Sequence, residues 1–222
     1  MNALEGIPFW SKLTKGQQDL LTASVQEFQY DKGTMVHGGG LDCVGLFLVL
    51  RGQLRVYTIS DEGRELTLYR LFDRDICLLS ASCILRGLQF DVMVSAVEDT
   101  KVLHIPTQVY QTLMQESISV TSYTNELMAS HFSEVMWLMD QIMNKKLDAR
   151  IAAFLLEESE LRNATKLSIT HEQIANHLGS AREVVTRMLK HFQTEGMLSL
   201  GRGSIELLNQ ELLRKLAIGS ER

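Results

Sequence analysis

The chain has 222 residues, of which 45% are hydrophobic, and it carries a formal net charge of −5. This length suffices for two modest domains with cores of their own, and no apolar run approaches the roughly 18 residues that a membrane span needs. The first residues lack the basic start and apolar core of a signal peptide, so we expect a cytoplasmic protein with no membrane segment.

Short strands separated by turns dominate the first half of the chain. A helical pattern over Ile7–Ala23 comes first, and from Val25 to about Pro106 apolar runs alternate with glycine-containing turns. The clearest of these runs are Val44–Leu50, Leu54–Ile59 and Glu65–Leu71. Regular short strands with such turns are typical of a small β-barrel or β-roll.

The chain has three cysteines, Cys43, Cys77 and Cys83. They are too few and too irregularly spaced for a disulfide framework or a four-cysteine zinc site. We expect small buried hydrophobic side chains in the β domain, and no metal site. Redox sensing by Cys77 and Cys83 is the alternative, although their separation does not match a CxxC motif.

From about Thr107 to Asn144 the hydrophobic period becomes helical. One stripe consists of Leu127, His131, Val135, Leu138 and Ile142. The stripe beside it consists of Met128, Phe132, Met136, Met139 and Met143. Together they are too wide for one partner, so we expect one side to cover the β-roll and the other to pair with a second copy of the chain, as in a short coiled coil. We expect His131 to be an interface histidine with satisfied hydrogen bonds; metal or haem ligation and pH sensing are the alternatives.

Asn144-Lys145-Lys146 is a polar hinge, and another helix begins at Leu147. Farther along, two amphipathic helical patterns flank Gly179. Each begins with the S/T-x-x-E/Q spacing of a capping box, Thr170 with Gln173 and Ser180 with Glu183. The residues expected to be buried are Ile174, Ala175 and Leu178 in the first helix, and Val184, Val185, Met188, Leu189 and Phe192 in the second.

The exposed face of the second helix carries Arg182, Glu183, Thr186 and Arg187 in its first turns. A helix-turn-helix presents this part of its second helix to the major groove, where Arg bonds guanine bidentately and Glu accepts from cytosine N4. The pattern therefore predicts a reader of double-stranded DNA. The alternative is an ordinary pair of capped helices whose charged residues are merely solvated.

The residues that follow favour DNA binding. Two short strand patterns, Leu198–Leu200 and Ser204–Leu207, are joined at Gly201-Arg202-Gly203, which indicates a hairpin with Arg202 at its tip, available to a phosphate. Residues 1–144 carry 10 basic and 17 acidic side chains, whereas residues 145–222 carry 12 and 10. The mildly basic C-terminal part can dock on DNA, and binding should be strongly salt-dependent.

A β-roll, a long helix and a winged helix-turn-helix in this order resemble the Crp/Fnr family of bacterial transcription regulators. The resemblance rests on Asp31-Lys32-Gly33-Thr34, the turn centred on Gly52, the segment Leu147–Leu156 and the recognition segment Ser180–Arg187. It implies an α+β fold with a cyclic-nucleotide-binding-like β-roll, a long dimerisation helix and a C-terminal winged helix-turn-helix. The expected parts are an effector-sensing domain at 1–116, a dimerisation helix and hinge at 117–144, and a DNA-binding domain at 145–222.

The resemblance also implies a homodimer that reads a two-fold related site and acts as a transcription activator, with RNA polymerase as a further partner. Arg182 and Arg187 would contact guanines, Glu183 would accept from cytosine, and Thr186 would contact the DNA backbone or a thymine methyl group. These readers suggest a half-site similar to TGTGA. Ser180 at the start of the recognition segment and Arg202 on the wing complete the expected DNA contacts. The residues themselves do not separate activation from repression.

The effector is where the chain departs from the best-known member. Cyclic-AMP-binding members carry a Gly-Glu pair and an Arg-Ser pair at the phosphate cassette, and neither occurs in Asp73–Leu85 or the residues after it, where Asp91 adds negative charge. The Thr-Ser pair that receives adenine falls near Val135-Met136, which is apolar. The iron–sulfur branch uses an N-terminal cysteine cluster, and this chain has no cysteine before Cys43.

We therefore expect an unknown small-molecule effector in a mostly apolar pocket, and neither cyclic AMP nor an iron–sulfur cluster. The expected pocket residues are Ile76, Cys77, Leu79, Ser80, Val135, Met136 and Met139. Haem is one candidate cofactor, with His131, His37 or Cys77 as axial ligand. The chain shows no clustered nucleophile, paired acid and base or glycine-rich phosphate loop, so we do not expect an enzyme. A haem or redox sensor whose output is protein–protein contact is the rival function.

Overall fold

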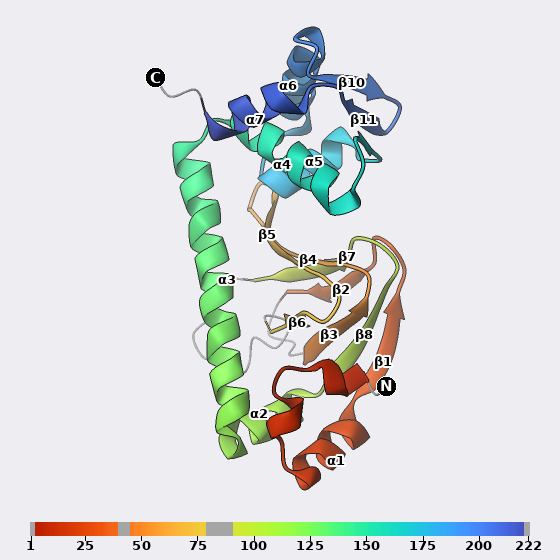
Figure 1. The fold of residues 1–222 in the computed structure, drawn as a ribbon, viewed down its shortest axis with the longest axis vertical. Helices are drawn as coiled ribbons and strands as arrows, with labels where there is room; N and C mark the ends of the chain where they lie inside the picture. The colour runs from red at the N-terminus through yellow and green to blue at the C-terminus, as the bar shows by residue number, and fades with distance from the viewer. Residues whose placement is uncertain (1–2, 40–44, 79–90, 220–222) are drawn as a thin grey trace. The chain divides into compact units, whose positions relative to one another are not determined.

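The computed structural model describes residues 3–39, 45–78 and 91–219 (Figure 1). Contacts between Cα atoms divide the chain into an N-terminal unit, residues 1–58 and 68–135, and a C-terminal unit, residues 59–67 and 136–222. Four residues of the sequence predictions, Cys43, Leu79, Ser80 and Cys83, lie outside the described residues.

The N-terminal unit is built on two four-stranded sheets. In the first the strand order is β1 (Gln26–Tyr30), β8 (Thr100–Ile105), β3 (Leu46–Arg51) and β6 (Ile76–Cys77). In the second it is β2 (Met35–Gly38), β7 (Met93–Ala96), β4 (Leu54–Ile59) and β5 (Glu65–Leu71). Neighbouring strands of the first sheet pair antiparallel, as do β2 with β7 and β4 with β7. The β-roll expected from the turn-punctuated pattern is confirmed.

Strand β3 shows how the sequence divides the core of this unit. Successive side chains of a strand point to opposite faces. Phe47 and Val49 join a buried cluster with residues of β4, β5 and β7, so they face the second sheet. Leu46 and Leu48 join a different cluster with helical residues. Because both faces of β3 are covered, it appears in the sequence as a continuous apolar run.

Helices cover the outer face of the first sheet. They include α1 (Lys15–Ser24), which begins with a complete Thr14–Gln17 capping box, and α2 (Thr107–Glu116), whose Tyr110 and Leu113 are fully buried. The long helix α3 (Ile118–Asn144) follows. Short 3-10 turns at Ala3–Gly6 and Trp10–Lys12 precede α1.

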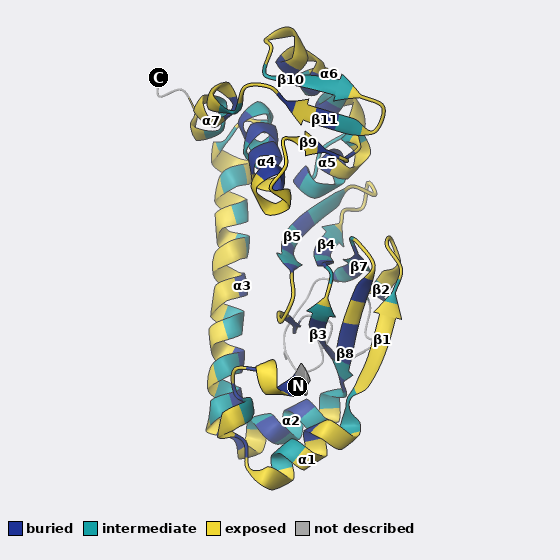
Figure 2. Cartoon of the chain, turned by 45° about the vertical axis from the view of Figure 1, so that its right-hand side comes forward, coloured by how far each residue is buried: buried dark blue, intermediate teal, exposed yellow. Residues whose placement is uncertain are grey.

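Helix α3 carries the two predicted apolar stripes, and their exposure differs (Figure 2). In the first stripe Leu127 packs against the core of the N-terminal unit and His131 is buried. In the second stripe the exposed residues are Phe132 (67%), Met136 (46%), Met139 (48%) and Met143 (76%). At Leu127, Met128 and His131 the helix covers its own β-roll, which confirms that expectation, whereas farther along Ile142 of the first stripe is exposed together with the four residues of the second.

The C-terminal unit continues with α4 (Leu147–Arg162), β9 (Lys166–Leu167), α5 (His171–Leu178) and α6 (Arg182–Thr194). It ends with β10 (Leu198–Gly201), β11 (Ser204–Leu207) and α7 (Gln210–Ile218). The predicted hairpin is present as β10–β11, and β9 adds a third strand beside β11. Sequence patterns missed β9 and α7, which are short.

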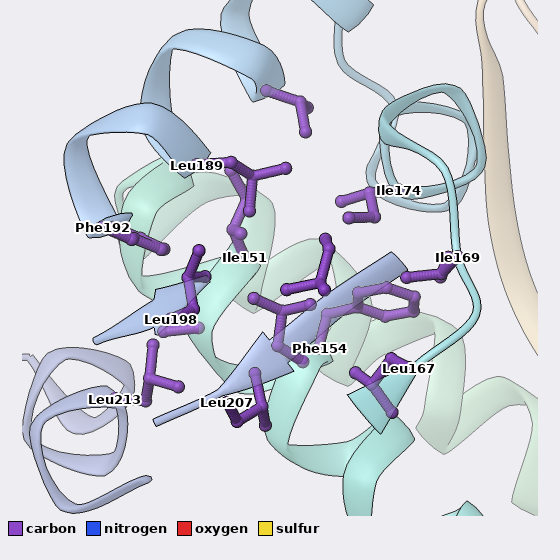
Figure 3. Close-up of a cluster of buried hydrophobic side chains, with 14 of the residues drawn as sticks. Ile151, Phe154, Leu167, Ile169, Ile174, Leu189, Phe192, Leu198, Leu207 and Leu213 are labelled. Carbon is purple, nitrogen blue, oxygen red and sulfur yellow. The ribbon is translucent and has the colours of Figure 1, made fainter. Parts of the chain in front are cut away.

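One buried cluster joins these elements (Figure 3). Its residues come from helices α4, α5, α6 and α7, from strands β9, β10 and β11, and from Ile169. Figure 3 labels Ile151, Phe154, Leu167, Ile169, Ile174, Leu189, Phe192, Leu198, Leu207 and Leu213. Because α6 contributes Val185, Leu189 and Phe192, its apolar face is anchored and its opposite face is free.

Removing the largest anchor of α6 should unfold this unit more easily. Phe192 is 1% exposed, and truncating a buried Phe to Ala typically costs about 3–5 kcal/mol, because contacts are lost and a cavity remains. Urea unfolding of Phe192→Ala should show this loss of unfolding free energy. The exposed neighbour Gln193→Ala is the matched control and should change stability by no more than about 0.5 kcal/mol. Equal effects of the two changes would contradict the packing described here.

Candidate nucleic-acid interface

The turn between α5 and α6 is held by local hydrogen bonds. Gly179 adopts a left-handed conformation with φ of +69°, and its N–H donates to the carbonyl of Ala175. The guanidinium of Arg150 in α4 donates to the carbonyl of Leu178 at 2.7 Å. A cation at the carbonyl end of a helix also interacts favourably with the helix dipole. These contacts fix the direction in which α6 leaves the turn.

Of the two predicted capping boxes, only the first is correct. Thr170 accepts from the N–H of Gln173, whose side chain accepts in return from the N–H of Thr170. At the second helix the prediction was wrong, because α6 begins at Arg182 with Ala181 as its N-cap and no side-chain cap. Ser180 instead belongs to the end of α5, where its N–H donates to the Ala175 carbonyl at 3.0 Å.

The three charged residues predicted to read bases lie on the exposed face of α6. Arg182, Glu183 and Arg187 are exposed, Val185 on the opposite face is fully buried, and Thr186 is half-buried. Arg182 and Glu183 fall in the first turn of α6, and Arg187 lies less than two turns from its start. This is the part of a recognition helix that meets base edges in a helix-turn-helix.

Two of these residues contact the first turn of α5. Arg182 Nη1 lies 3.4 Å from Glu172 Oε2, and both side chains are largely exposed. Exposed ion pairs contribute about 0–1 kcal/mol, so a DNA ligand can displace this one. Thr186 Oγ1 lies 2.9 Å from His171 Nδ1. Burial, and then the charges of Arg182 and Lys190, lower the pKa of His171, which keeps the imidazole neutral.

His171 and Glu172 were missed by the sequence analysis. The residues they contact are 15 and 10 positions away, beyond the reach of a helical period. The only available signal was their place in the first turn of the helix that precedes the recognition helix.

The β10–β11 hairpin lies next to these residues. Arg202 is exposed at the hairpin turn, where Gly203 has a φ of +69°. A hollow of about 400 Å³ separates the hairpin from the helices. It is lined by Ile169, Thr170, His171, Glu172, Arg182, Gly201, Gly203 and Ser204. The hairpin thus flanks the recognition helix as a wing. Two of the predicted DNA contacts lie off this helix, Ser180 in the turn before it and Arg202 on the wing.

Two family models match this chain. A Crp-like helix-turn-helix domain matches residues 149–216, and a cyclic nucleotide-binding domain matches residues 27–117. Together the two models cover more than half of the sequence. The chain belongs to the Crp/Fnr family. It is therefore a DNA-binding transcription regulator and not an enzyme.

Proteins similar to this Crp/Fnr regulator support the assignment to the family. A crystal structure of a crp/fnr family transcriptional regulator from Eubacterium rectale is 52% identical, with a TM-score of 0.94, over 97% of this chain and 100% of that one. The cyclic AMP receptor protein of Thermus thermophilus is 26% identical over 97% of this chain and 99% of its own length. The transcriptional activator protein anr of Pseudomonas aeruginosa is 26% identical over 85% of this chain and 79% of its own length.

The residues predicted for the effector pocket of this Crp/Fnr regulator lie in different environments. Ile76 and Cys77 are fully buried in β6, as expected of a small hydrophobic cysteine. On α3, Val135 is half-buried, whereas Met136 and Met139 are about half exposed. Whether these residues bind an effector stays a prediction.

A buried aromatic pair lies in the same unit. The rings of Tyr69 and His131 stack with centroids 4.1 Å apart and an interplanar angle of 10°. His131 Nδ1 lies 3.1 Å from Glu134 Oε2, and because a carboxylate only accepts, Nδ1 donates in this contact. Burial, and then Cys77 and Glu134, raise the pKa of Tyr69 well above its usual value.

Within the described part of the chain, neither Tyr69 Oη nor His131 Nε2 has a hydrogen-bond partner. The ring of His131 stacks on Tyr69 of its own chain and bonds to Glu134 through Nδ1, and its place at an interface between two copies stays a prediction. Residues 3–39, 45–78 and 91–219 contain no group of three or more His, Cys, Asp and Glu side chains that could hold a metal. No helix in these ranges is long and apolar enough to cross a membrane.

Proposed function

We propose that this Crp/Fnr regulator binds a two-fold related DNA site as a homodimer, with α6 in the major groove of each half-site. Arg182 and Arg187 bond guanines, Glu183 accepts from cytosine, and the half-site is similar to TGTGA. The observation that carries the proposal is the exposed face of α6, where three charged readers stand on a helix anchored by Val185, Leu189 and Phe192. We further propose that the regulator acts in the cytoplasm, where DNA and RNA polymerase are, and that it activates transcription.

The exposed stripe of α3 supports the homodimer. Phe132, Met136, Met139 and Met143 follow one another at intervals of four, three and four residues, which is the heptad spacing of a coiled-coil seam. Large apolar side chains gathered on one exposed face indicate an interaction surface. A second copy of the same stripe fits it because a two-fold interface pairs a surface with itself.

We propose that the effector is a small molecule other than cyclic AMP and that it binds the N-terminal unit. The residues available for hydrogen bonding support this proposal. The sequence contains no Arg-Ser pair to bind a cyclic phosphate, and the α3 positions that would receive a purine are the apolar Val135 and Met136. Tyr69 Oη and His131 Nε2, which have no hydrogen-bond partner among the described residues, are two buried polar atoms in this unit that a ligand could bond. An iron–sulfur cluster is not proposed, because no cysteine precedes Cys43.

The break between α3 and α4 supports a hinge. Helix α3 ends at Asn144 and α4 begins at Leu147, with Lys146 as its N-cap in an extended conformation. We propose that the effector changes the pairing of the two α3 helices and that the chain pivots at these residues. The recognition helices then move into or out of register with successive major grooves. Such a switch requires that the effector bind one of the two arrangements more tightly.

Salt dependence tests whether the winged helix-turn-helix contacts DNA. We expect the logarithm of the binding constant for a duplex to fall linearly with the logarithm of the salt concentration, because each phosphate contact releases counterions. A slope near zero of the logarithm of the binding constant against the logarithm of the salt concentration would contradict the proposal. It would favour a sensor whose output is protein–protein contact.

The proposed phosphate contact of Arg202 on the wing can be tested by the same salt titration. Arg202→Ala should weaken binding to all duplexes alike and reduce the salt slope by about one per subunit, because a phosphate contact carries no sequence information. Lys215→Ala on α7 removes the same charge outside the helix-turn-helix and wing, and should leave the slope unchanged. If both variants change the slope equally, the wing has no special role.

A further inference from the structure

The hydrogen bond between Thr186 and His171 bears on what the recognition helix can read. Thr186 lies four residues after Arg182 and three after Glu183, so it shares a helix face with these two readers. It is half-buried, whereas Arg182 and Glu183 are exposed. Its side chain carries a hydroxyl group and a methyl group, which can make opposite kinds of contact with DNA.

The hydroxyl group is already engaged within the protein. Thr186 Oγ1 lies 2.9 Å from His171 Nδ1, at the start of α5. A neutral imidazole nitrogen can donate to a hydroxyl oxygen or accept from it, so the contact is favourable in either tautomer. His171 faces two cations, Arg182 and Lys190, which together with burial disfavour a positive charge on its own ring.

Holding the hydroxyl oxygen fixes the other branch of the side chain. Oγ1 and Cγ2 are both attached to Cβ, and χ1 sits in staggered wells, so an Oγ1 turned to α5 turns Cγ2 away from it. In the major groove the distinctive apolar group is the C5 methyl of thymine, which Thr methyl groups contact.

We propose that Thr186 reads a thymine through its methyl group, and that His171 is the residue that positions it. The inference rests on the proposed DNA-reading function and specifies one base of the half-site. Where Nδ1 accepts the hydroxyl proton, Thr186 has no O–H left to donate to a phosphate oxygen, so this hydrogen bond leaves the methyl group as the side chain's contact with DNA. His171 acts through Thr186 and is a positioning residue, and it need not touch a base.

Replacing thymine with deoxyuridine tests the methyl contact alone. A duplex carrying the site selected by the wild-type protein is prepared with dU at each thymine of both half-sites in turn. At one position per half-site the wild-type protein should bind about four-fold more weakly per substituted half-site, the equivalent of about 0.8 kcal/mol for one buried methyl group. Equal affinity for thymine and dU at every position would overturn the proposal.

Two substitutions at Thr186 separate the methyl group from the hydroxyl group. Thr186→Ser keeps the hydroxyl and should lose the preference for thymine over dU. Thr186→Val keeps a methyl branch but loses the hydrogen bond to His171, so its preference for thymine should be reduced as in His171→Ala. A Thr186→Ser variant that keeps the full preference for thymine over dU would overturn the proposal.

Substitutions at His171 test the positioning role. His171→Ala should reduce the preference for thymine over dU while leaving affinity for the dU duplex and the melting temperature of the protein nearly unchanged. His171→Asn presents an amide in place of Nδ1 and should restore the preference. A full preference in His171→Ala would overturn the role of His171. If the wild-type protein selects no sequence at all, the proposed function itself fails, a result distinct from a site that is bound equally with thymine and dU.

Discussion

Arg187→Ala and Arg182→Ala should each remove most of the sequence-specific affinity for DNA. A bidentate guanine contact contributes about 1–3 kcal/mol of discrimination, and a homodimer loses it in both half-sites, so we expect a loss of about 2–6 kcal/mol per variant. Both side chains stand on the exposed face of α6, and neither belongs to its buried cluster, so the fold should survive the change. Affinities for the selected site and for a random duplex measure the effect.

Comparison with the random duplex identifies the kind of contact. Base readers should lose affinity for the selected site far more than for random DNA. Arg214→Ala on α7 is the matched control, because it removes an exposed arginine that bonds Gln210 outside the helix-turn-helix. If Arg187→Ala weakened both duplexes equally, Arg187 would be a phosphate contact and the base assignment would fail.

Phe132→Glu should convert the protein from a dimer to a monomer. Phe132 is 67% exposed in the single chain, so a glutamate is tolerated there without a partner. In a paired stripe the same glutamate would be desolvated opposite its own copy, where burying unpaired charge costs several kcal/mol. Sedimentation equilibrium should show a mass of 25.1 kDa for the variant and twice that for the wild type.

Ser130→Glu is the matched control for this experiment. Ser130 is exposed on the same helix, and at 3.6 residues per turn it lies about 160° around the axis from Phe132. It adds the same charge away from the stripe, so this variant should remain dimeric. A wild-type protein that is monomeric at micromolar concentration, or a Phe132→Glu variant that stays dimeric, would contradict the proposed pairing.

The elements that sequence patterns predicted best depend on neighbouring residues. The Thr170–Gln173 capping box and the buried Val185, Leu189 and Phe192 of α6 follow from spacings of three and four residues. Ser180 shows the limit of such spacings. Its motif matched a capping box, but the N–H of Ser180 donates to the Ala175 carbonyl at the end of α5. The N-cap of α6 is therefore Ala181, one residue after the predicted N-cap.

The details that patterns missed join residues far apart in the chain. Tyr69 and His131 stack across 62 positions, and no period of either segment could predict their contact. The exposure of the two α3 stripes likewise depended on which of them the β-roll covers, and on nothing within the helix itself. His171 reaches Thr186 from a different helix, so only the structure shows that the hydroxyl group of Thr186 is hydrogen-bonded within the protein.

Selection of binding sites from a pool of random duplexes measures whether the protein reads DNA sequence as a two-fold dimer. The wild-type homodimer should enrich a two-fold related sequence whose half-sites lie about 10–10.5 base pairs apart, centre to centre, and contain guanines that Arg182→Ala and Arg187→Ala no longer require. An unenriched pool, or an enriched sequence without two-fold symmetry that both variants select unchanged, would show that α6 does not read bases in a two-fold dimer.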